Sequence, residues 1–78
     1  MPGDENRLSQ ILEEVREEVE RAHSKYGKFN SLHEAYAVLL EESEEFWETL
    51  RRKEPAGRSR EEAIQVAAAV VAMIQDLL

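Results

Sequence analysis

The sequence contains no cysteine, few glycines and prolines, and no long apolar run. Without cysteine the chain has neither a disulfide framework nor a thiolate site, and two isolated histidines do not make a zinc site. The longest apolar run, residues 66–74, is less than half of the roughly 20 residues that span a bilayer. A chain of 78 residues can bury only a small hydrophobic core. With disulfides excluded, self-association is the remaining source of stability that we expect.

Basic residues are also scarce, because 10 lysines and arginines stand against 17 aspartates and glutamates, a net charge of −7. Nucleic-acid binders need a dense basic face, and anionic membrane surfaces attract the same residues. We therefore expect neither nucleic acid nor a membrane as a partner. Residues 1–6 are polar and acidic, unlike a signal peptide, which predicts a cytoplasmic protein.

Apolar residues recur with helical spacing over three segments, and no segment alternates as a strand does. The first predicted helix runs from about Arg7 to Lys25, preceded by a flexible N-terminus over residues 1–6. Gly27 is its expected end, because glycine readily adopts the left-handed conformation that closes a helix. The predicted fold is a single all-α domain over residues 1–78.

The second predicted helix begins at Ser31 and Glu34, which fit an S-x-x-E capping box, and it ends near Lys53. Residues 54–57 are the expected turn. This segment contains a proline, which cannot continue the helical hydrogen bonds, and a glycine, which permits a positive φ.

The third predicted helix begins with Ser59 as its N-cap and Glu62 three residues later, and residues 63–74 are apolar on almost every face. A helix of this kind is buried all round in a soluble protein, and two neighbours from one small chain cannot cover it. The sequence therefore predicts a three-helix protomer with antiparallel helices, assembled into an oligomeric helical bundle as a dimer or tetramer.

Acidic residues gather on the second predicted helix. They are Glu41, Glu42, Glu44, Glu45 and Glu48. Like charges one helical turn apart repel each other, and Glu42 also borders the apolar stripe of the helix. A hard divalent cation with oxygen ligands would offset this repulsion. The plainer interpretation is an acidic helix face that is simply solvated.

A second polar pair, Glu62 and Gln65, lies one turn apart on the most apolar helix, although Glu62 is equally explained as a capping residue. The expected register of the hairpin places Glu45 opposite Ala68, about 4.5 Å along the axis from Gln65. Glu42 and Glu62 start farther apart, so their meeting would require a bent turn or a partner subunit.

These two motifs, Glu41-Glu42-x-x-Glu45 and Glu62-x-x-Gln65, are separated by sixteen residues. Together they resemble the EExxE…ExxD signature of the all-α nucleoside triphosphate pyrophosphohydrolases of the MazG-like superfamily. Residues 26–36 and 61–67 look like its small bacterial and phage members. The resemblance implies an oligomeric helical bundle that binds Mg²⁺, with Mn²⁺ as the alternative ion. It also implies cleavage of nucleoside triphosphates to monophosphate and pyrophosphate, an activity that cleans the nucleotide pool.

Carried over by position, the resemblance makes Glu42, Glu45, Glu62 and Gln65 metal ligands. Glu41 becomes the base that activates water, or a group that supports the ligands. The family has an aspartate where this chain has Gln65, which offers a carbonyl oxygen but no charge. A catalytically weak or inactive helical oligomerisation or regulatory module is therefore the alternative function. A third hypothesis is an acidic helical partner protein unrelated to nucleotides.

Three further residues are predicted to contact the substrate: Trp47, Asn30 and Lys28. Trp47 would stack on a base, yet an aromatic residue beside an apolar stripe belongs to the core more often. Asn30 would read a base edge or else assist the turn. The basic residues available to phosphates are Lys25, Lys28, Arg51, Arg52, Lys53, Arg58 and Arg60. The run at 51–53 equally suits the C-terminal end of a helix.

Overall fold

The computed structural model describes residues 2–78, and the chain in this range is helical apart from two short links and its end. Three helices follow in order: α1 (Pro2–Tyr26), α2 (Leu32–Arg51) and α3 (Ala56–Leu77). No strand occurs within residues 2–78, so the predicted all-α fold with three helices is confirmed. None of these helices is long and apolar enough to cross a membrane, over the same residues.

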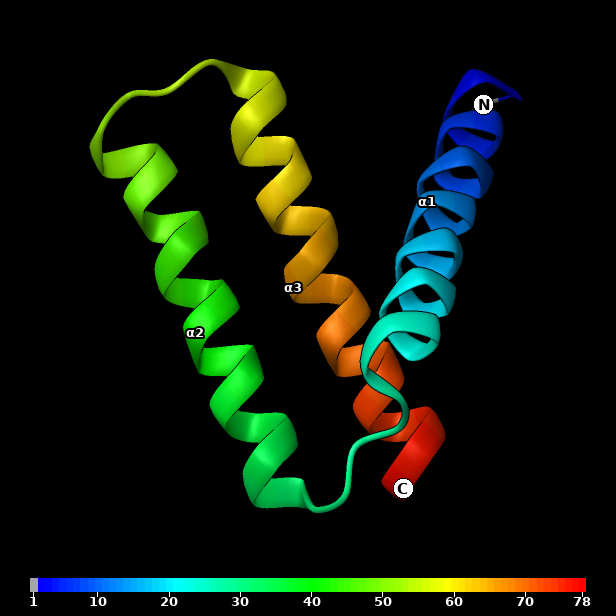
Figure 1. The fold of residues 1–78 in the computed structure, drawn as a ribbon. Helices are drawn as coiled ribbons and strands as arrows, with labels where there is room; N and C mark the ends of the chain where they lie inside the picture. Colours follow the sequence, from blue (N-terminus) through cyan, green and yellow to red (C-terminus); the bar gives the residue numbers. More distant parts are fainter. Residues whose placement is uncertain (1) are drawn as a thin grey trace.

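Helix α3 is the central element of the fold (Figure 1). The chain reverses at the link after α2, so that α3 runs back along α2 (Figure 1). Helix α1 packs against another side of α3 (Figure 1). Over the described residues, α1 and α2 do not pack against each other. Every helix pair that packs therefore includes α3.

Small apolar residues let α1 approach α3 closely. The buried cluster consists of Val15 and Val19 on α1 and Ala68 and Ala72 on α3, with Ile64, Ala67 and Phe29 packed against it. No large side chain is fully buried within residues 3–78, and several large apolar side chains are exposed. A core of this kind supplies only a few kcal/mol of stability, about 3–5 for a small domain.

The predicted signals around the first link are confirmed in part. Gly27 has a φ of 79°, and its amide donates to the carbonyl of His23 at 2.9 Å, which ends α1. The hydroxyl of Ser31 accepts from the amide of Glu34 at 3.1 Å, which begins α2. The carboxylate of Glu34 accepts a hydrogen bond from Asn30 Nδ2 at 3.1 Å. Asn30 thus assists the entrance of α2.

Helix α1 begins at Pro2, well before the predicted start at Arg7. The segment that we expected to be flexible is therefore helical from Pro2 onward, while Met1 lies outside the described residues. Proline fits the first helical position, because its φ is already helical and its missing N–H would have no partner there. Asp4 and Glu5 lie in the first turn, where negative charge interacts favourably with the helix dipole.

The end of α2 is a Schellman motif, which the sequence did not predict. The amides of Lys53 and Glu54 donate to the carbonyls of Leu50 and Thr49 at 3.1 and 3.0 Å. The left-handed residue of this link is Lys53, with a φ of 53°. The prediction that Gly57 supplies the positive φ is wrong, because Gly57 already belongs to the first turn of α3.

Helix α3 also begins earlier than predicted, so Ser59 is not its N-cap. Pro55 precedes the helix, and its carbonyl accepts from the amides of Arg58 and Ser59 at 2.9 and 3.4 Å. The hydroxyl of Ser59 instead contacts the hydroxyl of Thr49 on α2 at 2.9 Å. The side chain that looked like a cap therefore joins two helices.

The left-handed conformation of Lys53 gives a stability prediction. A side chain at this φ is strained, and glycine removes the strain, so Lys53→Gly should raise the free energy of unfolding by about 1 kcal/mol. The matched control is Lys53→Ala, which removes the charge but keeps the Cβ. Urea unfolding at neutral pH measures both. An equal gain in the two variants would show that the charge of Lys53, and not its backbone conformation, limits stability.

Candidate metal centre

Three carboxylates from two helices converge in the α2–α3 hairpin. Glu42 and Glu45 on α2 and Glu62 on α3 each offer one oxygen, and these oxygens lie within 4.8 Å of one another. Glu62 is 3% exposed, Glu42 is half-buried and Glu45 is exposed. The expectation that Glu42 and Glu62 need a bent turn or a partner subunit to meet is wrong, because one chain brings them together.

The register of the hairpin accounts for this difference. The hydroxyl of Thr49 donates its one hydrogen to a backbone carbonyl of its own helix, so the hydroxyl of Ser59 donates to Thr49 Oγ1 at 2.9 Å. Glu45 lies four residues before Thr49, and Glu62 lies three residues after Ser59. Because the two helices run in opposite directions from this contact, Glu45 lies beside Glu62 in the second turn of α3. The predicted position of Glu45, opposite Ala68, is therefore wrong.

Burial and neighbouring carboxylates disfavour the charged forms of Glu42 and Glu45. The pKa of Glu42 is raised to about 7, first by burial and then by the negative charges of Glu45, Glu62 and Glu41. Burial also raises the pKa of Glu45, and Glu62 and Glu41 add to that effect. One oxygen of Glu42 and one of Glu62 are buried without a hydrogen-bond partner in residues 3–78. Binding of protons or of a cation would relieve this repulsion.

The donor set fits a small divalent cation. All three groups offer carboxylate oxygens, the ligands that Mg²⁺ prefers. Opposite ligands of an octahedral ion with bonds of 2.1 Å are about 4.2 Å apart, slightly less than the spread of these oxygens. Small side-chain rotations would close the gap. The buried oxygens of Glu42 and Glu62 that have no hydrogen-bond partner also favour a cation site, because a bound cation would satisfy such oxygens.

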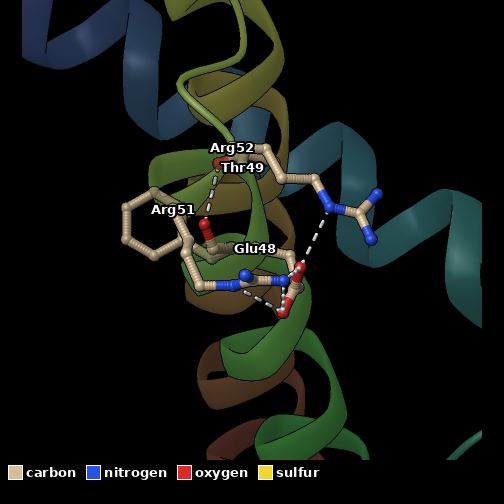
Figure 2. Close-up of polar contacts among 5 residues, drawn as sticks. Glu48, Thr49, Arg51 and Arg52 are labelled. Carbon is tan, nitrogen blue, oxygen red and sulfur yellow. Dashed lines mark hydrogen bonds and ion pairs between the residues drawn. The ribbon is translucent and has the colours of Figure 1, made fainter.

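Glu48 belongs to the same acidic run but not to this site. Its carboxylate contacts Arg51, the last residue of α2, at 2.7 Å and Arg52, which caps the helix, at 3.1 Å (Figure 2). The hydrogen bond from Arg51 is the main cause that holds the pKa of Glu48 below its usual range, although burial opposes it. Two residues of the basic run, Arg51 and Arg52, are therefore paired with Glu48, in agreement with a role at the end of the helix.

A cleft of about 490 Å³ lies beside the carboxylates. It is bounded by all three helices and by residues 27–29 of the first link, and α3 contributes small residues to it. Glu41, Glu42 and Gln65 line the cleft, and so does Lys28. Four of the predicted site residues therefore lie around one space.

The other two predicted substrate residues are placed differently. Trp47 is 59% exposed on α2 and is not part of the cleft wall. Asn30 is engaged with Glu34 at the entrance of α2. Phe29 does line the cleft, and it also packs against the buried cluster between α1 and α3. The aromatic residues that line the cleft are thus Tyr26 and Phe29, and not Trp47.

Asp76, near the end of α3, is a polar centre that sequence reasoning missed. Its Oδ2 lies 3.0 Å from His23 Nε2 and accepts from the amide of Phe29 at 3.0 Å, and its side chain is 1% exposed. Burial alone would raise the pKa of Asp76, but the Phe29 amide and His23 hold it below its usual range. The available signal was that Asp76 is the one charged residue within 63–78.

The raised pKa of Glu42 predicts an unusual pH dependence of stability in metal-free protein. Between the ordinary value of 4.5 and about 7 the native state binds more protons than the unfolded state, so stability falls as pH rises. We expect a loss of about 1 kcal/mol between pH 5 and pH 8, less than the whole shift implies because Glu42 is partly solvated.

In Glu42→Gln most of this loss should disappear, whereas Glu44→Gln, which removes an exposed carboxylate of α2, should keep it. Urea unfolding at both pH values in the presence of a chelator measures the loss. A pH slope in Glu42→Gln equal to that of the unsubstituted protein would contradict the placement of Glu42 among repelling charges.

No protein-family model matches this chain, and neither a curated protein nor a solved structure matches it. The relation to MazG-like proteins that the two motifs suggest therefore stays a prediction.

Proposed function

We propose that this protein is a Mg²⁺-dependent nucleoside triphosphate pyrophosphohydrolase of MazG-like type, with Mn²⁺ as the alternative ion. The observation that carries the proposal is the convergence of Glu42, Glu45 and Glu62 within 4.8 Å. The motif resemblance names these same three residues as metal ligands, and it does so without reference to their positions in space. A location in the cytoplasm, among the nucleoside triphosphates, goes with this function.

The residues of the hairpin have distinct roles in the proposed reaction. Glu42, Glu45 and Glu62 would hold the ion, and the amide oxygen of Gln65 would complete the set. The bound ion would supply positive charge to the phosphate oxygens, which lowers the barrier to attack. Glu41, which lines the cleft, would accept a proton from the attacking water.

In the reaction, the water oxygen forms a bond to the α-phosphorus, and the bond from that phosphorus to the bridging oxygen of the β-phosphate breaks. Pyrophosphate leaves with the electron pair of that bond. The proton taken by Glu41 then passes to solvent or to the leaving group, so one triphosphate and one water give one monophosphate and one pyrophosphate.

The size of the cleft favours a substrate larger than inorganic phosphate, such as a nucleotide. Its volume of about 490 Å³ lies in the range of small-molecule sites. Glu42 is the one of the three carboxylates that lines it, and the aromatic side chains of Tyr26 and Phe29, on which a base would stack, line it as well. Lys28 also lines the cleft and offers a positive charge to phosphate.

Self-association into a dimer or tetramer is the second part of the proposal. Exposed apolar residues recur along one face of α2, and they are Leu32, Tyr36, Leu40, Trp47 and Leu50. On α3, Val71 and Ile74 are 44% and 53% exposed, so α1 and α2 do not cover this helix completely. A large apolar stripe on a small domain is typical of an interaction surface.

The same stripe favours the second candidate function, a helical oligomerisation or regulatory module with little or no catalysis. Gln65 is the residue that points to this alternative, because it removes one formal charge from the proposed ligand set. Pyrophosphate release separates the two functions.

The enzymatic proposal predicts release of pyrophosphate from at least one canonical or modified nucleoside triphosphate in the presence of Mg²⁺ or Mn²⁺. Glu45→Gln should lower kcat/KM by about a hundredfold or more, because it removes a charged ligand of the ion. Glu44→Gln is the matched control, one residue away on the exposed side of α2, and should retain activity. Calorimetry should detect Mg²⁺ binding that Glu42→Gln abolishes.

If folded protein at high concentration releases no pyrophosphate from any triphosphate, the enzymatic proposal is wrong, and the helical oligomerisation or regulatory module is the remaining function. Activity that persists in Glu45→Gln would show that the reaction takes place elsewhere.

The apolar stripe of α2 predicts the oligomeric state. Light scattering should give a mass of at least twice that of the chain. The double variant Tyr36→Glu, Leu40→Glu should shift the protein toward the monomer, because charges cannot be buried in such an interface. Arg16→Glu, on an exposed face of α1, changes the net charge by the same amount and should leave the mass unchanged. A monomer in the unsubstituted protein would refute self-association.

A further inference from the structure

Arg58 is the cation that contacts the candidate metal centre. It lies in the first turn of α3, one turn before Glu62, and its Nη1 is 2.9 Å from Glu62 Oε1. The same Nη1 donates to Glu61 Oε2 at 3.2 Å. The guanidinium therefore bridges a buried carboxylate of the site and an exposed carboxylate outside it.

The partners of this ion pair differ strongly in burial. The Glu62 side chain is 4% exposed, whereas the side chains of Arg58 and Glu61 are 48% and 69% exposed. Arg58 can therefore leave Glu62 by rotation of its own side chain, without opening the core. Glu62 cannot follow it, because its carboxylate is held between α2 and α3.

The other arginines near the site are already engaged with residues outside it. Arg60 binds both oxygens of Glu14 at 2.6 Å, and Arg21 binds Glu18 at 2.6 Å. Among the ion pairs of the described residues, Arg58 alone pairs with one of the three converging carboxylates. It satisfies one oxygen, and it leaves the second oxygen of Glu62 buried without a partner.

We propose that Arg58 occupies Glu62 in place of a metal ion and transfers to the phosphate chain of the substrate when the ion binds. This inference rests on the proposed pyrophosphohydrolase function. A divalent ion on Glu62 removes most of the attraction between that carboxylate and the guanidinium. The released guanidinium presents paired N–H donors, which match the oxygens of a phosphate group.

The exchange has two consequences of opposite sign. Arg58 competes with the ion for Glu62, so it weakens metal binding in the absence of nucleotide. In the presence of nucleotide it adds hydrogen bonds to the phosphates, so it strengthens substrate binding. A residue with a purely structural role at the start of α3 would not produce this combination.

The test measures both consequences in Arg58→Gln. Calorimetric titration with Mg²⁺ alone should show affinity several-fold tighter than in the unsubstituted protein. Steady-state hydrolysis at saturating Mg²⁺ should show KM for the triphosphate raised about tenfold or more, with a smaller change in kcat. Circular dichroism checks that the variant remains helical.

Two further variants serve as matched controls. Arg60→Gln removes an arginine of the same helix that pairs away from the site, and it should change neither metal affinity nor KM. Arg58→Lys retains the positive charge but not the paired donors, so its metal affinity should stay near that of the unsubstituted protein while KM takes an intermediate value.

The outcomes separate this inference from the function on which it rests. Metal affinity that is unchanged or weaker in Arg58→Gln overturns the competition, and an unchanged KM overturns the contact with phosphate. Both leave the pyrophosphohydrolase proposal standing if the unsubstituted protein hydrolyses triphosphates. Absence of metal binding and hydrolysis in the unsubstituted protein overturns the function and this inference together.

Discussion

The hydroxyl contact between Thr49 and Ser59 is the constraint on which the candidate site depends. Thr49 is 2% exposed, its hydroxyl accepts from Ser59, and its carbonyl takes part in the Schellman motif that ends α2. One residue therefore both ends a helix and sets where the next helix lies against it. Because register along a helix decides which turns meet, this contact brings the Glu42–Glu45 turn of α2 to Glu62.

The repulsion in the site follows directly from that register. Packing between α2 and α3 excludes water from Glu62 and partly from Glu42, and this strengthens every interaction between charges. Hydrophobic contacts of the hairpin oppose the repulsion in the metal-free chain, assisted by one guanidinium. At the proposed metal centre a bound cation would relieve repulsion that is already present, and side-chain movements without a change of the helices would be enough to complete its ligand set.

The sequence was sufficient for some of this structure but not for all of it. Helical spacing predicted three helices, and the S-x-x-E pattern predicted the start of α2, because these signals act over a few residues. The left-handed Lys53 and the cross-helix role of Ser59 could not be predicted, since α3 begins at Ala56, before the Ser59 cap signal, and takes Gly57 into its first turn. The motifs selected the three carboxylates, but their meeting within one chain depended on the register, which no local pattern encodes.

The central position of α3 has a consequence for the order in which the chain folds. The Thr49–Ser59 contact joins residues only 10 apart in sequence, whereas the pairs Arg60–Glu14 and Asp76–His23, which hold α1, join residues 46 and 53 apart. Closing the longer loops costs about 1.5 kcal/mol more in chain entropy. The α2–α3 hairpin, with its three carboxylates, is therefore the natural nucleus, and α1 docks afterwards to complete the cleft wall.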